Sequence, residues 1–294
     1  MSFISGVTAF EIWQVDVFTS VAFEGNPLAV VFSAEHLSAK DRQAIARETN
    51  LSETVFISQP TQGGDYALHI HTTRREISFA VHPSIGAAYA FAVATGYTGN
   101  TLRQECKIGI VPIRRNEDMD GWYTEVPSAH FLQCDVTMAE SARWLGLPMA
   151  AIATQTIEVA SAGVPWLMVE LTEIAALAEI NPNYSEIAAA TSRNGAVGVT
   201  VYSRSPTSGV IARLRSFAPA EGIYEDPVCG SCVGALAALL RRDDTTIAAQ
   251  NVLCFEQGQE INRPGLVHAL TCANSCAVGG NAVIVMRGRI LIGD

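Results

Sequence analysis

The chain has 294 residues, of which 49% are hydrophobic and 16% are charged. A chain of this length and composition can bury a substantial core, so we expect a folded protein of two domains rather than a disordered one. Acidic residues outnumber basic ones by 29 to 19, and no run of Lys or Arg could follow a phosphate backbone. This charge balance excludes nucleic acid as an expected partner.

The opening residues, MSFISGVTAFEIWQVDVF, lack the basic start and the sustained apolar stretch of a signal peptide. No segment approaches the roughly 20 unbroken apolar residues that a membrane-spanning helix needs. The cysteines number seven, and an odd count in a chain of this size fits reduced thiols better than a disulfide framework. We therefore expect a cytoplasmic protein without a membrane partner.

Alternating or β-branched apolar residues predict strands along most of the chain. The predicted strands span residues 11–18, 28–32, 54–58, 66–72, 156–161, 166–171, 197–203, 209–217 and 281–292. A helix over 38–49 begins with the capping pair Ser38 and Asp41, and a second begins where Thr137 and Glu140 form a capping box. Two further helices, over 83–96 and 231–242, are apolar nearly all round, so we expect both to be buried.

Short sequence matches in the same order indicate an internal repeat. GNPLAVV at Gly25 resembles GVPWLMV at Gly163, TVFISQP at Thr54 resembles TVYSRSP at Thr200, and HPSIGAA at His82 resembles DPVCGSC at Asp226. The offsets are 138, 146 and 144 residues. A nearly constant offset predicts two related halves.

The repeat places His82 and Asp226 at equivalent positions, each just before or within the start of a buried helix. If a pseudo-two-fold axis relates the halves, both helix starts face one cleft between the domains. A helix N-terminus presents unpaired N–H groups and a partial positive charge, which favour an anionic group such as a carboxylate. The sequence therefore predicts a site for a small anionic metabolite.

Cysteine and histidine spacings suggest other chemistries, which we weigh against structural roles. Cys229 and Cys232 form C-G-S-C at a predicted helix start, as in disulfide oxidoreductases, but the repeat explains this loop without thiol chemistry. Those two with Cys272 and Cys276 have zinc-like spacing, yet the second pair has the pattern of buried strand residues.

Two histidines, His69 and His71, share one face of a predicted strand. Without a nearby third ligand, we interpret both as exposed strand positions rather than metal ligands. Taken one at a time, Glu53, His82 and Asp226 could each have a purely structural role, as a helix cap or as a polar side chain whose hydrogen bonds are satisfied within the protein.

Taken together, several segments resemble the signature blocks of the PhzF family, named for an isomerase of phenazine biosynthesis. The blocks are FEGNPLAVV, NLSETVFI, FAVHPSIGAAYAF, FAPAEGIYEDPVCGSCVGALAALL and the ending VGGNAVIVMRGRILI. The resemblance runs in the family's order from Gly25 to the C-terminus. It implies an α/β fold of the diaminopimelate epimerase-like class, with two pseudo-symmetric domains that each wrap a mixed sheet around a central helix.

The resemblance also implies a role for each matching residue. Glu53 would be the acid/base that moves a proton on the substrate, while His82 and Asp226 would orient and polarise it. The amides of Gly230 and Ser231, with the Ser231 hydroxyl, would hold a carboxylate. No metal or organic cofactor is implied, and a homodimer is expected from the family alone.

Two positions depart from the family's pattern. Val81 stands where the family commonly has glycine, so a side chain is placed where a backbone amide should meet the ligand. Cys229 stands where the family usually has threonine, at a position that resembles one catalytic thiol of the related two-cysteine epimerases. The partner thiol would be expected near Val81, and valine cannot serve as acid or base, which disfavours a thiol-dependent epimerase or racemase that uses Cys229.

We therefore expect a cofactor-independent isomerase that shifts a proton on a small amino- or hydroxy-substituted carboxylate, with acid–base catalysis by Glu53, His82 and Asp226. Val81, Cys229, Gly230 and Ser231 would contact the substrate. The alternative is a non-catalytic module on the same fold that binds a small anion or a protein. The expected N-terminal domain spans 1–127 plus about 282–294, and the C-terminal domain spans 128–281.

Overall fold

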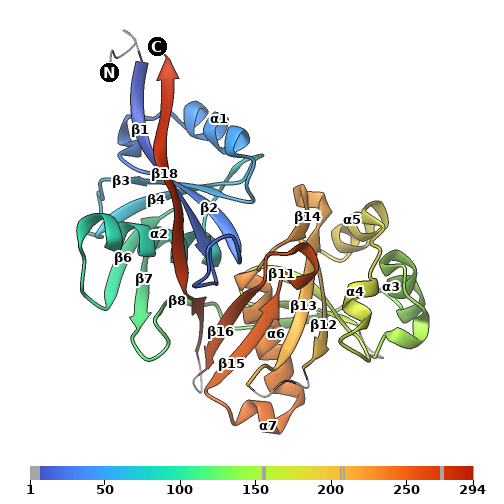
Figure 1. Ribbon diagram of the computed structural model, residues 1–294. Coiled ribbons are helices and arrows are strands. Elements are labelled where there is room, and N and C mark those ends of the chain that lie inside the picture. The colour runs from blue at the N-terminus through green and yellow to red at the C-terminus, as the bar shows by residue number, and fades with distance from the viewer. Residues whose placement is uncertain (1–6, 154–156, 206, 208, 272–274, 294) are drawn as a thin grey trace. The chain divides into compact units, whose positions relative to one another are not determined.

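A computed structural model describes residues 7–153, 157–205, 207, 209–271 and 275–293 (Figure 1). The chain divides into two compact units. The first unit holds Pro27–Thr124 with the terminal segments up to Phe23 and from Gly280, and the second holds Glu24–Asn26 and Glu125–Gly279. Thr156 of a predicted strand and Cys272 of the zinc interpretation lie outside the described residues.

The first unit combines a mixed sheet with two α-helices. Its strands are β1 (Val7–Val17), β2 (Asn26–Val31), β3 (Thr54–Ser58), β4 (Tyr66–His71), β5 (Glu76–Ile77), β6 (Thr101–Cys106), β7 (Gly109–Asn116), β8 (Gly121–Val126) and β18 (Ala282–Gly293). The helices are α1 (Ala39–Thr49) and α2 (Val81–Thr95). Strand β1 pairs antiparallel with β18, whereas β2 with β3 and β4 with β6 are parallel pairs. The chain's first and last strands therefore lie side by side in one sheet.

The apolar helix α2 is the core element of the first unit. It packs against strands β1, β3, β4, β6, β7 and β18. Its N-terminal two-thirds is almost entirely buried, as its sequence predicts. At Gly86 a Cβ atom would lie 2.5 Å from Leu28 Cδ2 and 2.8 Å from Val17 Cγ2, so only glycine permits this close approach of helix to sheet. The sheet of the first unit wraps around this helix.

The second unit likewise combines strands with α-helices. Its strands are β9 (His130–Gln133), β10 (Glu158–Ser161), β11 (Pro165–Glu170), β12 (Gly198–Arg204), β13 (Ala212–Ala218), β14 (Ile223–Asp226), β15 (Val252–Gln257), β16 (Gly265–Thr271) and β17 (Cys276–Gly280). Its helices are α3 (Met138–Leu145), α4 (Ala176–Glu179), α5 (Tyr184–Arg193), α6 (Gly230–Asp243) and α7 (Thr245–Ala248). Helix α6 packs against β10, β11 and β16 and is buried along most of its length.

The strand pairings of the two units repeat in the same order. In the first unit β2 and β3 are parallel, β3 and β4 antiparallel, β4 and β6 parallel, and β6 and β7 antiparallel. In the second unit β11, β12, β13, β15 and β16 repeat this series of pairings. The repeat found in the sequence thus corresponds to a repeated topology, with α2 and α6 in equivalent places.

The predicted helix starts are confirmed by their capping hydrogen bonds. Ser38 accepts from the Asp41 N–H at the start of α1, and Thr137 accepts from the Glu140 N–H at the start of α3. Helix α5 was not predicted, although its Asn183 accepts from the Glu186 N–H. The same polar-x-x-acid signal that identified the other two helices marks this one.

Candidate active site

Glu53 and His82 meet in the first unit, and we call this pair with Val81 the first half-site. Glu53 lies in the turn between α1 and β3, and His82 is the second residue of α2. His82 Nδ1 lies 3.2 Å from Glu53 Oε2, and both side chains are largely shielded from solvent. An ionised carboxylate only accepts hydrogen bonds, so an ionised Glu53 accepts a hydrogen bond from the N–H of His82 Nδ1. Residues 29 positions apart in the chain thus form one acid–base pair.

The other ring nitrogen of His82 has a different environment. His82 is 5% exposed, and its Nε2 has no hydrogen-bond partner among the described residues. A buried polar atom without a partner costs about 1–3 kcal/mol and calls for an explanation such as a catalytic role. When Nδ1 donates to Glu53, a neutral His82 presents Nε2 as an acceptor.

Val81 is the first residue of α2 and is buried. The residue before it, Ala80, is in the extended conformation of an N-cap but has no side chain that could accept from the helix. Ser84 makes a local contact instead, since its hydroxyl donates to the Ala80 carbonyl at 2.8 Å. No capping side chain therefore covers the N–H groups at the start of α2 among the described residues.

Asp226, Cys229, Gly230 and Ser231 form the second half-site in the second unit. Asp226 ends β14, and Gly230 begins α6 with Cys229 as its N-cap. Cys229 makes no side-chain capping bond to the helix. Asp226 and the amides at the start of α6 therefore lie within one short turn.

The thiol of Cys229 does not have the environment of a reactive cysteine. Burial, followed by the neighbouring Cys232 thiol, raises the pKa of Cys229 well above its usual value. Cys232 donates to the Cys229 carbonyl at 3.1 Å, and its sulfur lies 3.3 Å from the Ser216 hydroxyl. A thiolate is the nucleophilic form of cysteine. The burial of this thiol thus argues against both the redox and the thiol-dependent epimerase interpretations.

Two amide side chains that sequence reasoning missed hold the second half-site in place. Asn26 Nδ2 donates to Asp226 Oδ1 at 2.7 Å and to the Val228 carbonyl at 2.9 Å. Gln257, which is buried, donates to the Asp226 carbonyl at 2.7 Å and accepts from the Cys229 N–H at 3.0 Å. Both therefore fix the turn that carries the predicted residues.

Asn26 is itself anchored to the second unit. Arg263 donates from Nε to the Gly25 carbonyl at 3.0 Å and from Nη2 to the Glu24 carbonyl at 2.8 Å, and the Gly25 N–H donates to the Pro264 carbonyl at 2.9 Å. Asn26 stands in the quoted block FEGNPLAVV, which is the one sequence signal that pointed to it. Its partner Asp226 is 200 residues away, so no local pattern could reveal the contact.

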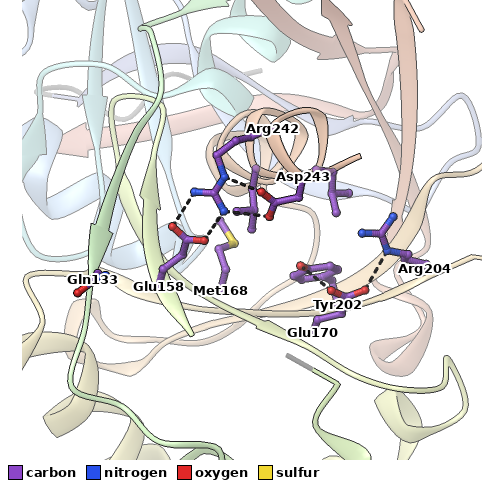
Figure 2. Close-up of a pocket in the computed structure, with 10 residues that line it drawn as sticks. Gln133, Glu158, Met168, Glu170, Tyr202, Arg204, Arg242 and Asp243 are labelled. Carbon is purple, nitrogen blue, oxygen red and sulfur yellow. Dashed lines mark hydrogen bonds and ion pairs between the residues drawn. The ribbon is translucent and has the colours of Figure 1, made fainter. Parts of the chain in front are cut away.

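A separate pocket of about 510 Å³ lies in the second unit, and none of the predicted site residues lines it (Figure 2). Arg242 binds both oxygens of Glu158 and also Asp243, while Arg204 binds Glu170 and Asp244. The charged side chains in this pocket therefore neutralise one another and connect the end of α6 to the sheet. We interpret this pocket as structural support for α6.

The paired strand histidines correct one expectation. His69 is partly exposed and bonds through Nδ1 to Glu76 at 2.9 Å, but His71 is buried, contrary to prediction. His71 Nδ1 lies 3.0 Å from Gln43 Oε1, and Gln43 donates to the Thr72 carbonyl. Helix α1 covers this end of β4, which a strand pattern alone does not show. Among the described residues no group of three or more His, Cys, Asp or Glu could hold a metal ion.

Comparison with protein families places the chain among known sequences. Residues 15–288 match the model of the family PhzC-PhzF, described as phenazine biosynthesis-like protein. A fission yeast protein named antisense-enhancing sequence 1 is 33% identical, with 95% of this chain and 98% of the relative covered. A trans-2,3-dihydro-3-hydroxyanthranilate isomerase of Pseudomonas chlororaphis is 32% identical, with the same two shares covered.

Solved structures agree on the fold. A PhzF-family phenazine biosynthesis protein of Bacillus anthracis superposes with a TM-score of 0.86 at 23% identity, covering 97% of this chain and all of that one. A hydroxyproline epimerase of Agrobacterium vitis superposes with a TM-score of 0.63 at 12% identity, covering 99% and 93%. These likenesses confirm the expected diaminopimelate epimerase-like fold. No helix among the described residues is long and apolar enough to span a membrane.

Proposed function

Because this chain belongs to the PhzC-PhzF family and is an isomerase, we propose that it moves a proton between two carbon atoms of a small cyclic carboxylate. The substrate would be unsaturated and carry an amino or hydroxy group, as the name of the Pseudomonas relative indicates for that enzyme. The pair formed by Glu53 and His82 carries this proposal, because it joins a carboxylate to a buried imidazole whose Nε2 has no hydrogen-bond partner among the described residues.

In the proposed mechanism Glu53 takes a proton from an sp³ carbon of the substrate. The C–H electron pair enters the adjacent π system, and the protonated Glu53 then delivers a proton to another carbon of that system. The product is an isomer of the substrate, so electrons and protons balance without an oxidant, a metal or an organic cofactor. A positioned acid/base group contributes roughly 10² to 10⁴-fold to such a step.

The remaining residues would bind and orient the substrate. His82, held through Nδ1 by Glu53, would accept a hydrogen bond at Nε2 from an amino or hydroxy group. The N–H groups of Gly230 and Ser231 at the start of α6, with the Ser231 hydroxyl, would hold the carboxylate. Asp226, held by Asn26, would accept from a polar substituent of the ring.

Exchange of solvent deuterium into carbon tests the proposal. The protein is incubated in D₂O with unsaturated cyclic amino and hydroxy carboxylates, including trans-2,3-dihydro-3-hydroxyanthranilate, and incorporation is read by mass spectrometry. Glu53→Gln should lower incorporation by at least roughly 100-fold. Glu76→Gln is the matched control, because Glu76 also pairs with a histidine in the first unit but outside the half-site. Equal loss in both variants, or full turnover by Glu53→Gln, would refute the role of Glu53.

A second candidate function follows from Val81. Val81 stands where the family commonly has glycine, so its side chain would narrow the binding site. A module that only binds a small anion, without catalysis, would tolerate this narrower site. This version predicts that a carboxylate raises the melting temperature by mass action while no deuterium enters it. Any enzyme-dependent incorporation excludes it. The homodimer expected from the family stays a prediction, which sedimentation equilibrium tests.

A further inference from the structure

Trp166 donates a hydrogen bond directly to a residue of the second half-site. Its indole Nε1 lies 3.1 Å from Ser231 Oγ, across 65 residues of chain. Trp166 is the second residue of β11 and is 4% exposed, and Ser231 is the second residue of α6. An indole N–H can only donate, so the Ser231 oxygen is the acceptor of this bond. One lone pair of the hydroxyl is therefore occupied by the indole N–H.

The fold makes a specific place for this indole ring. The parallel pairing of β11 with β12 sets Trp166 opposite Gly198. A Cβ atom at Gly198 would lie 2.5 Å from Trp166 Cζ3 and 2.5 Å from the Phe217 carbonyl oxygen. Glycine thus leaves the space that the ring fills, and a larger residue would displace it. The direction of the N–H is consequently set by close packing rather than by a flexible side chain.

The second neighbour of the Ser231 hydroxyl is Cys229, whose sulfur lies 3.4 Å from Ser231 Oγ. Burial keeps this thiol protonated, because it raises the pKa of Cys229. A protonated thiol can donate weakly to the second lone pair of Ser231. With donors on its oxygen, the hydroxyl has its own proton available for an acceptor. A carboxylate is such an acceptor, and a charge-assisted hydrogen bond is about twice as strong as a neutral one.

We propose that Trp166 is a positioning residue of this isomerase, whose indole N–H orients the Ser231 hydroxyl so that it donates to the carboxylate of the substrate. This inference rests on the proposed function, because it assumes that the carboxylate binds at the start of α6. It goes beyond that function by adding Trp166, which lies in none of the five family blocks. Trp166 acts through Ser231 and does not touch the substrate.

The test measures binding of a stable probe, 3-hydroxyanthranilate, by isothermal titration calorimetry, and turnover by deuterium incorporation. Trp166→Phe keeps a large ring and removes the N–H, and it should weaken probe binding by about 3- to 10-fold, the value of one hydrogen bond. KM should rise by a similar factor with kcat nearly unchanged, because the carboxylate contact serves substrate and transition state alike. In a Ser231→Ala background the same substitution should have no further effect on binding.

Trp144→Phe is the matched control. Trp144 is buried in the hydrophobic core of the same unit, and its indole N–H has no hydrogen-bond partner among the described residues. This substitution should leave probe affinity unchanged. If Trp166→Phe and Trp144→Phe change affinity equally, or if Trp166→Phe weakens binding as strongly with Ser231→Ala present as without it, the positioning role is wrong.

A measurement on Ser231 keeps the proposal testable if Trp166→Phe does not fold. The indole N–H signals of ¹⁵N-tryptophan-labelled protein are recorded by NMR, and the Trp144 signal is identified as the one that disappears in Trp144→Phe. Ser231→Ala should shift one other indole signal strongly and leave the Trp144 signal unchanged. No shift in any indole signal would overturn the proposal. If the wild-type protein bound no carboxylate and exchanged no deuterium, the proposed function itself would fail, whereas binding that is sensitive to Ser231 but not to Trp166 would overturn only this inference.

Discussion

The ion pair between Arg215 and Glu225 supports the strand that carries Asp226, and its removal should destabilise the second unit severely. Arg215 Nε and Nη2 donate to the two oxygens of Glu225, both at 2.8 Å, and Nη1 donates to the Leu177 carbonyl at 2.7 Å. The two side chains are only 8% and 10% exposed. Arg215→Met leaves the Glu225 carboxylate buried without its partner, and such a loss costs about 3–5 kcal/mol.

A control variant separates the loss of stability in Arg215→Met from a general effect of removing an arginine. Arg193 also binds two carboxylates, those of Asp135 and Glu140, but its side chain is 43% exposed. Arg193→Met should therefore destabilise the protein much less than Arg215→Met, because a solvent-exposed ion pair contributes little to stability. The double substitution Arg215→Met with Glu225→Leu removes both buried charges and should recover most of the loss, because an apolar pair of similar volume avoids the desolvation penalty.

Urea denaturation followed by circular dichroism and tryptophan fluorescence gives the free energy of unfolding of each variant. Deuterium incorporation into the substrate, measured on each variant without urea, reports whether Asp226, next to Glu225 in the chain, remains correctly placed. The argument would be refuted if Arg215→Met were no more destabilising than Arg193→Met, or if the double variant were less stable than Arg215→Met alone.

Two further outcomes follow from the structure. Asn26→Ala removes the donor to Asp226 and should lower deuterium incorporation by roughly 10-fold. Asn26→Asp should lower incorporation further, because it places a second carboxylate beside that of Asp226. Wild-type activity in Asn26→Asp would contradict this role of Asn26. Burial lowers the pKa of His71 from 6.5 to about 4, so the folded state resists its protonation and loses stability as the pH falls from about 6.5 to 4. His71→Leu should flatten the free energy of unfolding over that range in urea titrations, and an unchanged pH dependence would show that His71 is not the group responsible.

Local sequence signals predicted the strands β1 to β4, β10 to β13 and β18 and the helices α1, α2, α3 and α6, whereas the strands β5 to β9 and β14 to β17 were not predicted. The caps of α1 and α3, the all-apolar character of α2 and α6, and the repeat depend on neighbours in the chain, so they could be read directly. The family resemblance added roles for Glu53, His82 and Asp226, which no local pattern supplies. Helix α5 was within reach by the same rules, since Asn183 and Glu186 form the capping signal.

Tertiary structure alone decided which residues support the site. Trp166 reaches Ser231 because β11 packs against α6, and Asn26 reaches Asp226 because residues 24–26 belong to the second unit. The burial of His71 likewise depends on α1 covering β4. The physical reason is common to all three: a hydrogen bond or a covered surface depends on the distance between atoms in space, whereas periodicity and capping depend on separation along the chain.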